Sequence, residues 1–139
     1  MPELSKRVGE FTDSVIRRMT RISDATPGSI NLSQGFPDFD PPQVLLDALR
    51  EMAGGGEQHQ YSVTYGSENL RRCIAEKYSP IHGYEIDPET QVVVTCGGTE
   101  AMMAAMMTVC NPGDKVIVFS PFYENYGADA ILSGAEPIY

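Results

Sequence analysis

The sequence has no tryptophan and few basic residues: 10 lysines and arginines stand against 19 aspartates and glutamates, giving a net charge of −9. Proteins that bind nucleic acid carry a basic patch or stripe, so we predict no nucleic-acid partner. No apolar run approaches the roughly 18 residues that a membrane-spanning helix needs. The first residues also lead into no apolar core of a signal peptide. We therefore expect no membrane partner and a cytoplasmic location.

Cysteine and histidine are also scarce and scattered. Cys73, Cys96 and Cys110 form no C-x-x-C pair, and His59 and His82 do not cluster with them. Structural metal sites need ligands at short, regular spacings that converge on one point. The spacing predicts three reduced thiols, most of them buried, and no metal site.

Strand and helix patterns alternate from residue 92 onward, which is typical of an α/β fold with a parallel sheet and right-handed crossovers. The expected order is a strand over 92–95, a helix over 100–109, a strand over 115–119, a helix over 126–132 and a strand from 136. A three-stranded parallel sheet that ends on an exposed edge is unusual. We therefore expect the 139 residues to be the front part of a longer fold.

The first 91 residues read as helices joined by loops. Apolar residues spaced by three and four predict one helical stripe over 4–22. Asp40 is expected to cap a helix that Gly54-Gly55-Gly56 ends, and Ser67 to cap another that stops before a loop over 80–88. Between them, the loop 33–42 holds two phenylalanines, which either anchor the loop to the core or line a pocket.

The stretch Val92-Val93-Val94-Thr95-Cys96-Gly97-Gly98-Thr99-Glu100-Ala101 contains the strongest candidate site. It reads as a buried strand that passes through two glycines into a helix. Backbone N–H groups at a helix start, together with the helix dipole, favour a bound anion. The pattern is neither the G-x-x-x-x-G-K-[ST] loop of ATP sites nor the G-x-G-x-x-G loop of dinucleotide sites. On its own, a tight structural turn is the better explanation of the glycines.

Tyr123 follows the next expected strand. Parallel α/β sheets bind their ligands at the carboxyl ends of the strands, and both Tyr123 and the turn at 97–99 belong to that edge. A phosphate cradle beside an aromatic side chain suggests a phosphorylated aromatic cofactor, whereas ordinary packing is the alternative role for the tyrosine.

Five motifs together resemble the class I/II aminotransferases, enzymes of fold type I that depend on pyridoxal 5′-phosphate. The motifs occur in the family's order and cover nearly the whole chain: Asn31-Leu-Ser-Gln-Gly-Phe-Pro-Asp-Phe39, Tyr61-Ser-Val-Thr-Tyr-Gly66, Thr95-Cys-Gly-Gly-Thr-Glu-Ala101, Asn111-Pro-Gly-Asp114 and Ser120-Pro-Phe-Tyr123. The amino-acid sequence of the first loop is most similar to that of the aspartate, kynurenine or methionine aminotransferase-like branch. The resemblance implies the N-terminal part of the fold-type I fold: a helical arm, then the start of a mostly parallel sheet with flanking helices.

The resemblance also implies roles for particular residues. Gly98 and Thr99 would contact the cofactor phosphate, and Tyr123 would stack on the pyridine ring. Gly35 would lie against the substrate α-carboxylate, and Tyr61 would reach across a homodimer interface to the neighbouring subunit's phosphate. Residues 1–40 would form an arm and loop in the small domain or dimer contact, and residues 41–139 the first part of the large cofactor-binding domain.

The resemblance implies an enzyme that transfers an amino group between an amino acid and a 2-oxo acid, using a lysine that forms a Schiff base with the cofactor. The only lysines are Lys6, Lys77 and Lys115, and none stands in a family-like setting. We therefore assign no catalytic residue and expect the 139 residues alone to be inactive. Alternatives are a non-catalytic truncated or split-protein fragment, a small phosphate-binding module, and another fold-type I enzyme such as a C–S lyase or decarboxylase.

Overall fold

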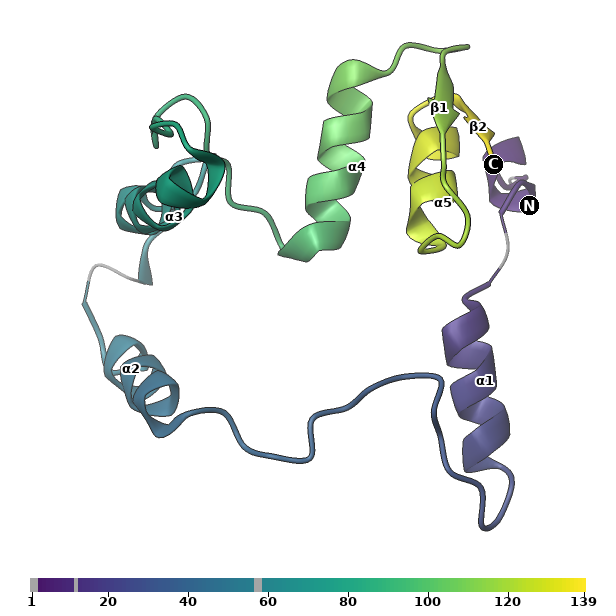
Figure 1. The fold of residues 1–139 in the computed structure, drawn as a ribbon, viewed down its shortest axis with the longest axis horizontal. Helices are drawn as coiled ribbons and strands as arrows, with labels where there is room; N and C mark the ends of the chain where they lie inside the picture. Colours follow the sequence, from purple (N-terminus) through teal and green to yellow (C-terminus); the bar gives the residue numbers. More distant parts are fainter. Residues whose placement is uncertain (1–2, 12, 57–58) are drawn as a thin grey trace. The chain divides into compact units, whose positions relative to one another are not determined.

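A computed structural model describes residues 3–11, 13–56 and 59–139 (Figure 1). The chain forms two compact units, one made of residues 3–11 and 62–139 and the other of residues 13–61, of which 57–58 are outside the description. The elements in chain order are η1 (Lys6–Gly9), α1 (Val15–Asp24), α2 (Gln43–Ala53), α3 (Glu68–His82), α4 (Gly97–Val109), β1 (Lys115–Ile117), α5 (Asn125–Leu132) and β2 (Glu136–Ile138).

The first unit contains a β1–α5–β2 crossover, in which the two strands pair in parallel with Val116 opposite Pro137. Helices α4 and α5 pack against each other, and β2 also contacts α5. The small core between them is formed by Met106, Ala130 and Ala135, with Met102, Cys110 and Val116 packed around it. The strand–helix–strand prediction for residues 115–138 is therefore confirmed, although β1 ends two residues earlier than expected.

Helix α3 is fixed to its surrounding loops by one buried side chain. Arg71 is 3% exposed. Its Nη1 donates to the carbonyl oxygen of Pro88 at 2.6 Å, its Nε donates to the carbonyl oxygen of Gly66 at 3.2 Å, and Nη1 also lies 3.2 Å from the Glu89 carboxylate. A buried guanidinium is tolerated only when its donors are satisfied in this way. As predicted, Ser67 caps this helix, with its hydroxyl accepting from the N–H of Leu70 at 3.3 Å.

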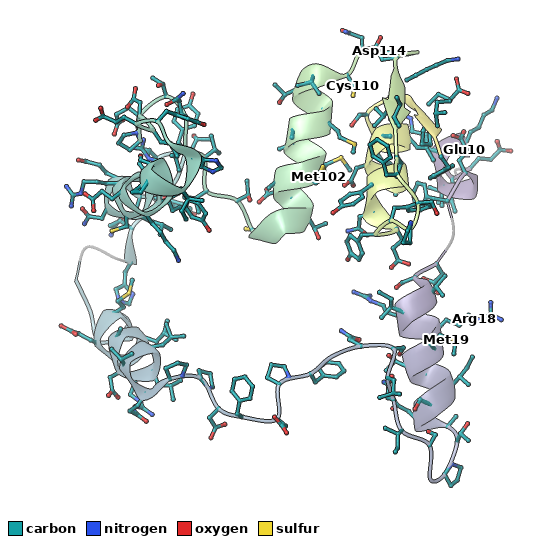
Figure 2. All side chains as sticks on the ribbon, in the orientation of Figure 1. Glu10, Arg18, Met19, Met102, Cys110 and Asp114 are labelled. Atoms are coloured by element: carbon teal, nitrogen blue, oxygen red, sulfur yellow. The ribbon has the colours of Figure 1, made fainter. Side chains whose placement is uncertain are left out.

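The second unit contains α1 and α2, whose side chains are drawn in Figure 2. Neither helix buries a residue. The predicted single stripe over 4–22 is wrong, because η1 ends at Gly9 and α1 starts separately. Ser14 caps α1 by accepting from the N–H of Arg17 at 3.3 Å. The predicted Asp40 cap is also wrong. Pro42 adopts an extended conformation with ψ of 137°, so α2 begins only at Gln43 and no side chain caps it.

Two further predictions are corrected in the first unit. Residues 92–95 form no strand: in the described part of the chain, Val94 makes a single backbone bond, to the carbonyl oxygen of Tyr65 at 2.9 Å, and neither β1 nor β2 pairs with the segment. Helix α3 continues through Pro80 to His82, although a loop was predicted to begin at residue 80. A proline near the end of a helix removes one N–H bond, and Gly83 with φ of +75° then ends the helix.

Some ionisable and polar groups have unusual surroundings. Asp129 in α5 is 4% exposed, and its Oδ2 has no hydrogen-bond partner among the described residues. Burial raises the pKa of this carboxyl above its usual value.

The prediction of mostly buried thiols is wrong, because Cys73 and Cys96 are exposed and Cys110 is half-buried.

Across the described residues, no helix is both long and apolar enough to cross a membrane. No group of three or more histidine, cysteine, aspartate or glutamate side chains in that same part of the chain is placed to hold a metal ion.

Candidate cofactor site

The turn before α4 is held by its own backbone and by one carboxylate. The N–H of Gly97 donates to the carbonyl oxygen of Thr95 at 2.8 Å, and Gly97 has φ of +85°, a conformation that favours glycine. The Glu100 carboxylate accepts a hydrogen bond from the N–H of Cys96. Helix α4 consequently begins at Gly97, three residues earlier than predicted.

The next two backbone donors remain open. Within the described residues, the N–H groups of Gly98 and Thr99 make no backbone hydrogen bond outside the helix, and they are too close to its start for an intrahelical partner. A Cβ atom on Gly98 would meet nothing within 4 Å. Since the Glu100 carboxylate is turned back to Cys96, these two N–H groups and the helix dipole provide a place for an anion.

Tyr123 reaches the same place from the end of β1. The segment 118–124 leads from β1 into α5, and Phe122 stacks on Tyr139 with ring centroids 4.8 Å apart. Tyr123 packs edge-to-face with Tyr126, with centroids 5.9 Å apart and the planes at 80°. It nevertheless remains 47% exposed, which leaves ring surface for stacking.

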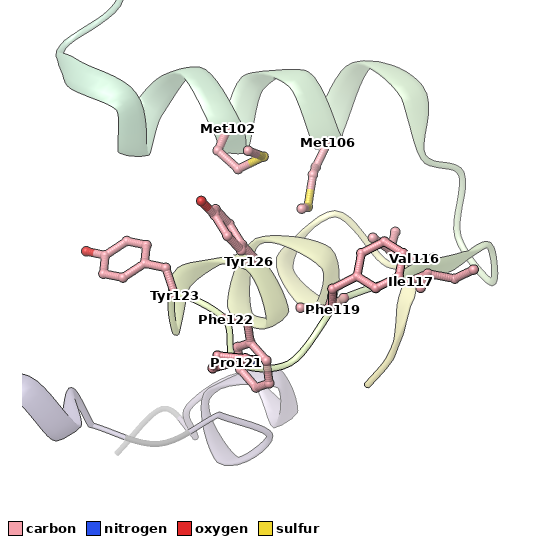
Figure 3. A pocket seen from close by; sticks show the side chains of 10 residues that line it. Met102, Met106, Val116, Ile117, Phe119, Pro121, Phe122, Tyr123 and Tyr126 are labelled. Carbon is pink, nitrogen blue, oxygen red and sulfur yellow. The ribbon is translucent and has the colours of Figure 1, made fainter.

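These parts line one pocket of about 310 Å³, which is formed by Gly98, Thr99, Met102, Tyr123, Asn125 and Tyr126. A second pocket of about 470 Å³ adjoins it and shares Met102, Tyr123 and Tyr126 (Figure 3). In Figure 3, Met102 and Met106 project from α4 toward the α5 side, where Tyr126 lies opposite Met102. The structure therefore brings together three of the five predicted site residues, namely Gly98, Thr99 and Tyr123.

The other two predicted residues belong to the second unit. Gly35 lies in the loop between α1 and α2, with nothing within 4 Å of a Cβ atom placed on it. Tyr61 is fully exposed. Their contacts with substrate and with a neighbouring subunit stay predictions, as does the domain division at residue 40.

The three lysines lie elsewhere. The Nζ of Lys115 is 3.8 Å from the Glu136 carboxylate on the surface of the strand pair, and the Nζ of Lys77 lies 5.8 Å from the centroid of the Tyr78 ring. Lys6 is exposed in η1. None of them is among the residues that line either pocket.

Sequence reasoning missed Asn125. This residue is the first of α5, and its Nδ2 donates to Oγ1 of Thr99 at 3.3 Å, which joins the starts of the two helices. The available signal was its position two residues after Tyr123, at the same carboxyl edge of the sheet.

The residues present fit a ligand with an anionic group and a flat ring. Two backbone N–H groups and a hydroxyl provide hydrogen bonds for the anion, and the tyrosine lines the same pocket. No lysine or arginine lines it among the described residues, so the anion would be stabilised by hydrogen bonds and the dipole of α4.

Comparison with known proteins identifies relatives of this architecture. The family described as aminotransferase class I and II matches residues 27–139. The chain is 37% identical over 132 residues to a probable N-succinyldiaminopimelate aminotransferase of Mycobacterium tuberculosis, covering 95% of this chain and 33% of that protein. It is 42% identical over 106 residues to the methionine aminotransferase of Escherichia coli, covering 76% of this chain and 27% of that protein.

Solved structures of aminotransferases also resemble this chain. The N-succinyldiaminopimelate aminotransferase of Mycobacterium tuberculosis has a TM-score of 0.86 at 36% identity, over 98% of this chain and 35% of that one. A methionine aminotransferase from Escherichia coli has a TM-score of 0.88 at 33% identity, over 99% of this chain and 36% of that one.

The chain thus spans about a third of the length of these relatives, and its fold is the N-terminal part of the fold-type I architecture, as predicted. The family match covers most of the chain and includes Gly35, the turn at 97–99 and Tyr123. The chain belongs to the class I and II aminotransferases, a family of enzymes that depend on pyridoxal 5′-phosphate.

Proposed function

We propose that the pocket at the start of α4 is the phosphate and ring wall of a pyridoxal 5′-phosphate site. We further propose that the complete protein transfers an amino group between an amino acid and a 2-oxo acid. The observation that supports this most directly is the convergence of Gly98, Thr99 and Tyr123 on one pocket of about 310 Å³. When bound, the cofactor supplies an electron sink that lets an amino acid lose its Cα proton and exchange its amino group.

The phosphate is held by the first turn of α4. The N–H groups of Gly98 and Thr99 donate to its oxygens, and the Thr99 hydroxyl adds a third donor. Hydrogen bonds to a charged acceptor are about twice as strong as neutral ones. The positive end of the helix dipole adds to them at this point. The Glu100 carboxylate accepts from the Cys96 N–H, so it does not occupy the N–H groups of Gly98 and Thr99.

Tyr123 would hold the cofactor ring by stacking on it, and its edge-to-face contact with Tyr126 supports the tyrosine ring from one side. Mostly apolar side chains line the adjoining pocket, which shares Tyr123 with the proposed cofactor site.

The remaining predicted residues complete the proposal. Gly35 lets the substrate α-carboxylate approach the backbone closely, since no side chain stands there. Tyr61 acts across a homodimer interface on the neighbouring subunit's phosphate, and its full exposure leaves the phenol free for this contact. A homodimer in the cytoplasm is the form we infer for the complete protein.

The substrate classes follow the relatives, which are named for N-succinyldiaminopimelate, methionine and kynurenine with oxoglutarate. We infer an amino-acid donor and a 2-oxo acid acceptor for the complete protein. Among the residues that the structure describes, no lysine lines the pocket, so we expect the 139 residues alone to bind cofactor without turnover.

Equilibrium binding tests this proposal. Titration of the full chain with pyridoxal 5′-phosphate, followed by the absorbance of the cofactor, is expected to show saturable binding that inorganic phosphate weakens. Amino transfer from methionine or kynurenine to 2-oxoglutarate is expected in the complete protein and absent from the 139 residues alone. Failure to bind the cofactor, or binding that phosphate does not affect, would contradict the assignment of the α4 turn.

A further inference from the structure

We propose that Asn125 is a positioning residue, which orients the hydroxyl group of Thr99 so that its hydrogen points to the cofactor phosphate. This inference rests on the proposed function of the pocket. The two side chains are 26 positions apart in the sequence and belong to different helices, yet Nδ2 of Asn125 lies 3.3 Å from Oγ1 of Thr99. Both residues line the pocket of about 310 Å³.

The direction of this hydrogen bond determines what the hydroxyl can do next. An amide Nδ2 only donates, so the oxygen of Thr99 must accept. A hydroxyl has a single hydrogen, and accepting a bond leaves that hydrogen available for another acceptor. Thr99 lines the pocket at the start of the helix. In the proposed site, the acceptor for its hydrogen there is the anion to which the backbone N–H groups of Gly98 and Thr99 also donate.

A second threonine in the same helix shows the alternative. The hydroxyl of Thr108 donates back to the carbonyl oxygen of Ala104 at 2.7 Å, the usual arrangement for threonine inside a helix. The carbonyl oxygen four residues before Thr99 belongs to Thr95, and it already accepts from the N–H of Gly97. Among the described residues Thr99 makes no such back-bond, so its hydroxyl is free for the orientation that Asn125 gives it.

The position of Asn125 links the two walls of the pocket. The residue lies between Tyr123 and Tyr126, whose rings pack edge-to-face. The short segment 123–126 therefore contains both the tyrosine that would stack on the cofactor ring and Asn125, which orients the hydroxyl of Thr99 toward the phosphate. A shift of this segment would change ring stacking and phosphate binding together.

Binding measurements on the full chain test the proposal, with pyridoxal 5′-phosphate and unphosphorylated pyridoxal as the two probes. Asn125→Ala is expected to weaken binding of the phosphorylated probe by about three- to tenfold, the usual effect of one hydrogen bond. Asn125→Asp is expected to weaken it by about tenfold or more, because a carboxylate takes the hydroxyl hydrogen and repels the phosphate. Pyridoxal affinity is expected to stay within about twofold in both variants. Asn69→Ala, at an exposed asparagine of α3 whose side chain contacts Arg72, is the matched control.

A double-mutant cycle separates positioning from general damage. In a Thr99→Val background, Asn125→Ala is expected to cause no further loss for the phosphorylated probe, because its effect passes through the missing hydroxyl. The inference is overturned if Asn125→Ala has no effect, acts equally on both probes, or acts equally with and without the Thr99 hydroxyl. A wild-type protein that binds both probes equally would instead contradict the proposed phosphate site itself, so the two failures are distinguishable.

Discussion

A Cβ atom added to Gly66 would lie 2.5 Å from the Cβ of Val94, inside the distance that two carbon atoms can approach. Gly66 has φ of +97°, and the N–H of Val94 donates to the carbonyl oxygen of the adjacent Tyr65 at 2.9 Å. The absence of a side chain at residue 66 lets this loop lie directly on the segment that leads into the α4 turn.

We predict that Gly66→Ala lowers the free energy of unfolding by about 2–4 kcal/mol, since overlap with Val94 is added to an unfavourable backbone conformation. Gly83→Ala is the control, because Gly83 also has positive φ but open space around it, and about 1 kcal/mol is expected there. Urea denaturation measures both. Equal losses in the two variants would show that contact with Val94 is unimportant.

Removal of the buried guanidinium is expected to be costly. Arg71→Ala leaves the carbonyl oxygens of Gly66 and Pro88 without their donors, and we predict a loss of about 2–4 kcal/mol in the free energy of unfolding. The neighbouring Arg72 is exposed and lies 3.9 Å from Glu76, so Arg72→Ala is expected to cost less than about 0.5 kcal/mol. A similar effect of both substitutions in chemical denaturation would contradict the role given to Arg71.

Asp129 gives a pH-dependent prediction. Burial raises the pKa of Asp129 in the folded state, so the folded protein favours the protonated carboxyl. The resulting contribution to stability is fully present below about pH 3.8, the usual aspartate pKa, and is lost as pH rises through the pKa of the folded state. We predict that Asp129→Asn raises the melting temperature at pH 7, with a gain of about 1–2 kcal/mol from removing an unpaired buried charge. The gain should shrink as pH falls toward 4. A gain that is constant with pH, or a loss at pH 7, would refute this explanation.

Ring stacking by Tyr123 predicts that the aromatic ring matters and the phenol hydroxyl does not. Tyr123→Phe is expected to keep affinity for pyridoxal 5′-phosphate within about twofold, whereas Tyr123→Ala is expected to weaken it about tenfold, as loss of one stacked ring does. Both effects should be the same for pyridoxal, because stacking does not involve the phosphate. A stronger effect of Phe than of Ala would assign the hydroxyl a role that stacking does not explain.

Local chemistry in the sequence predicted several features correctly. Ser67 caps α3 and Gly54 ends α2, because capping and chain termination depend on residues close in sequence. The parallel pairing of residues 115–117 with 136–138 followed from the expected strand–helix–strand order of this part of the chain. Gly98, Thr99 and Tyr123 line one pocket, as predicted, although only half of the premise holds: Tyr123 follows strand β1, whereas residues 92–95 before the α4 turn form no strand.

Features that depend on distant partners were not predictable in the same way. A strand exists only where a neighbour pairs with it, and the valines at 92–94 carry no information about that neighbour. The bond between Asn125 and Thr99 depends on how α4 and α5 lie against each other, which periodicity does not specify. Asp40 looks like a helix cap, but the two prolines after it keep the chain extended until Gln43.

The most direct test of the central claim compares pyridoxal 5′-phosphate with pyridoxal in the wild-type full chain and in Thr99→Val. If the first turn of α4 binds the phosphate, the wild type binds the phosphorylated form at least about tenfold more tightly, as several charge-assisted hydrogen bonds should provide. Thr99→Val should reduce that preference while leaving pyridoxal binding unchanged. Equal binding of the two forms by the wild type, or a preference that Thr99→Val does not alter, would contradict the account.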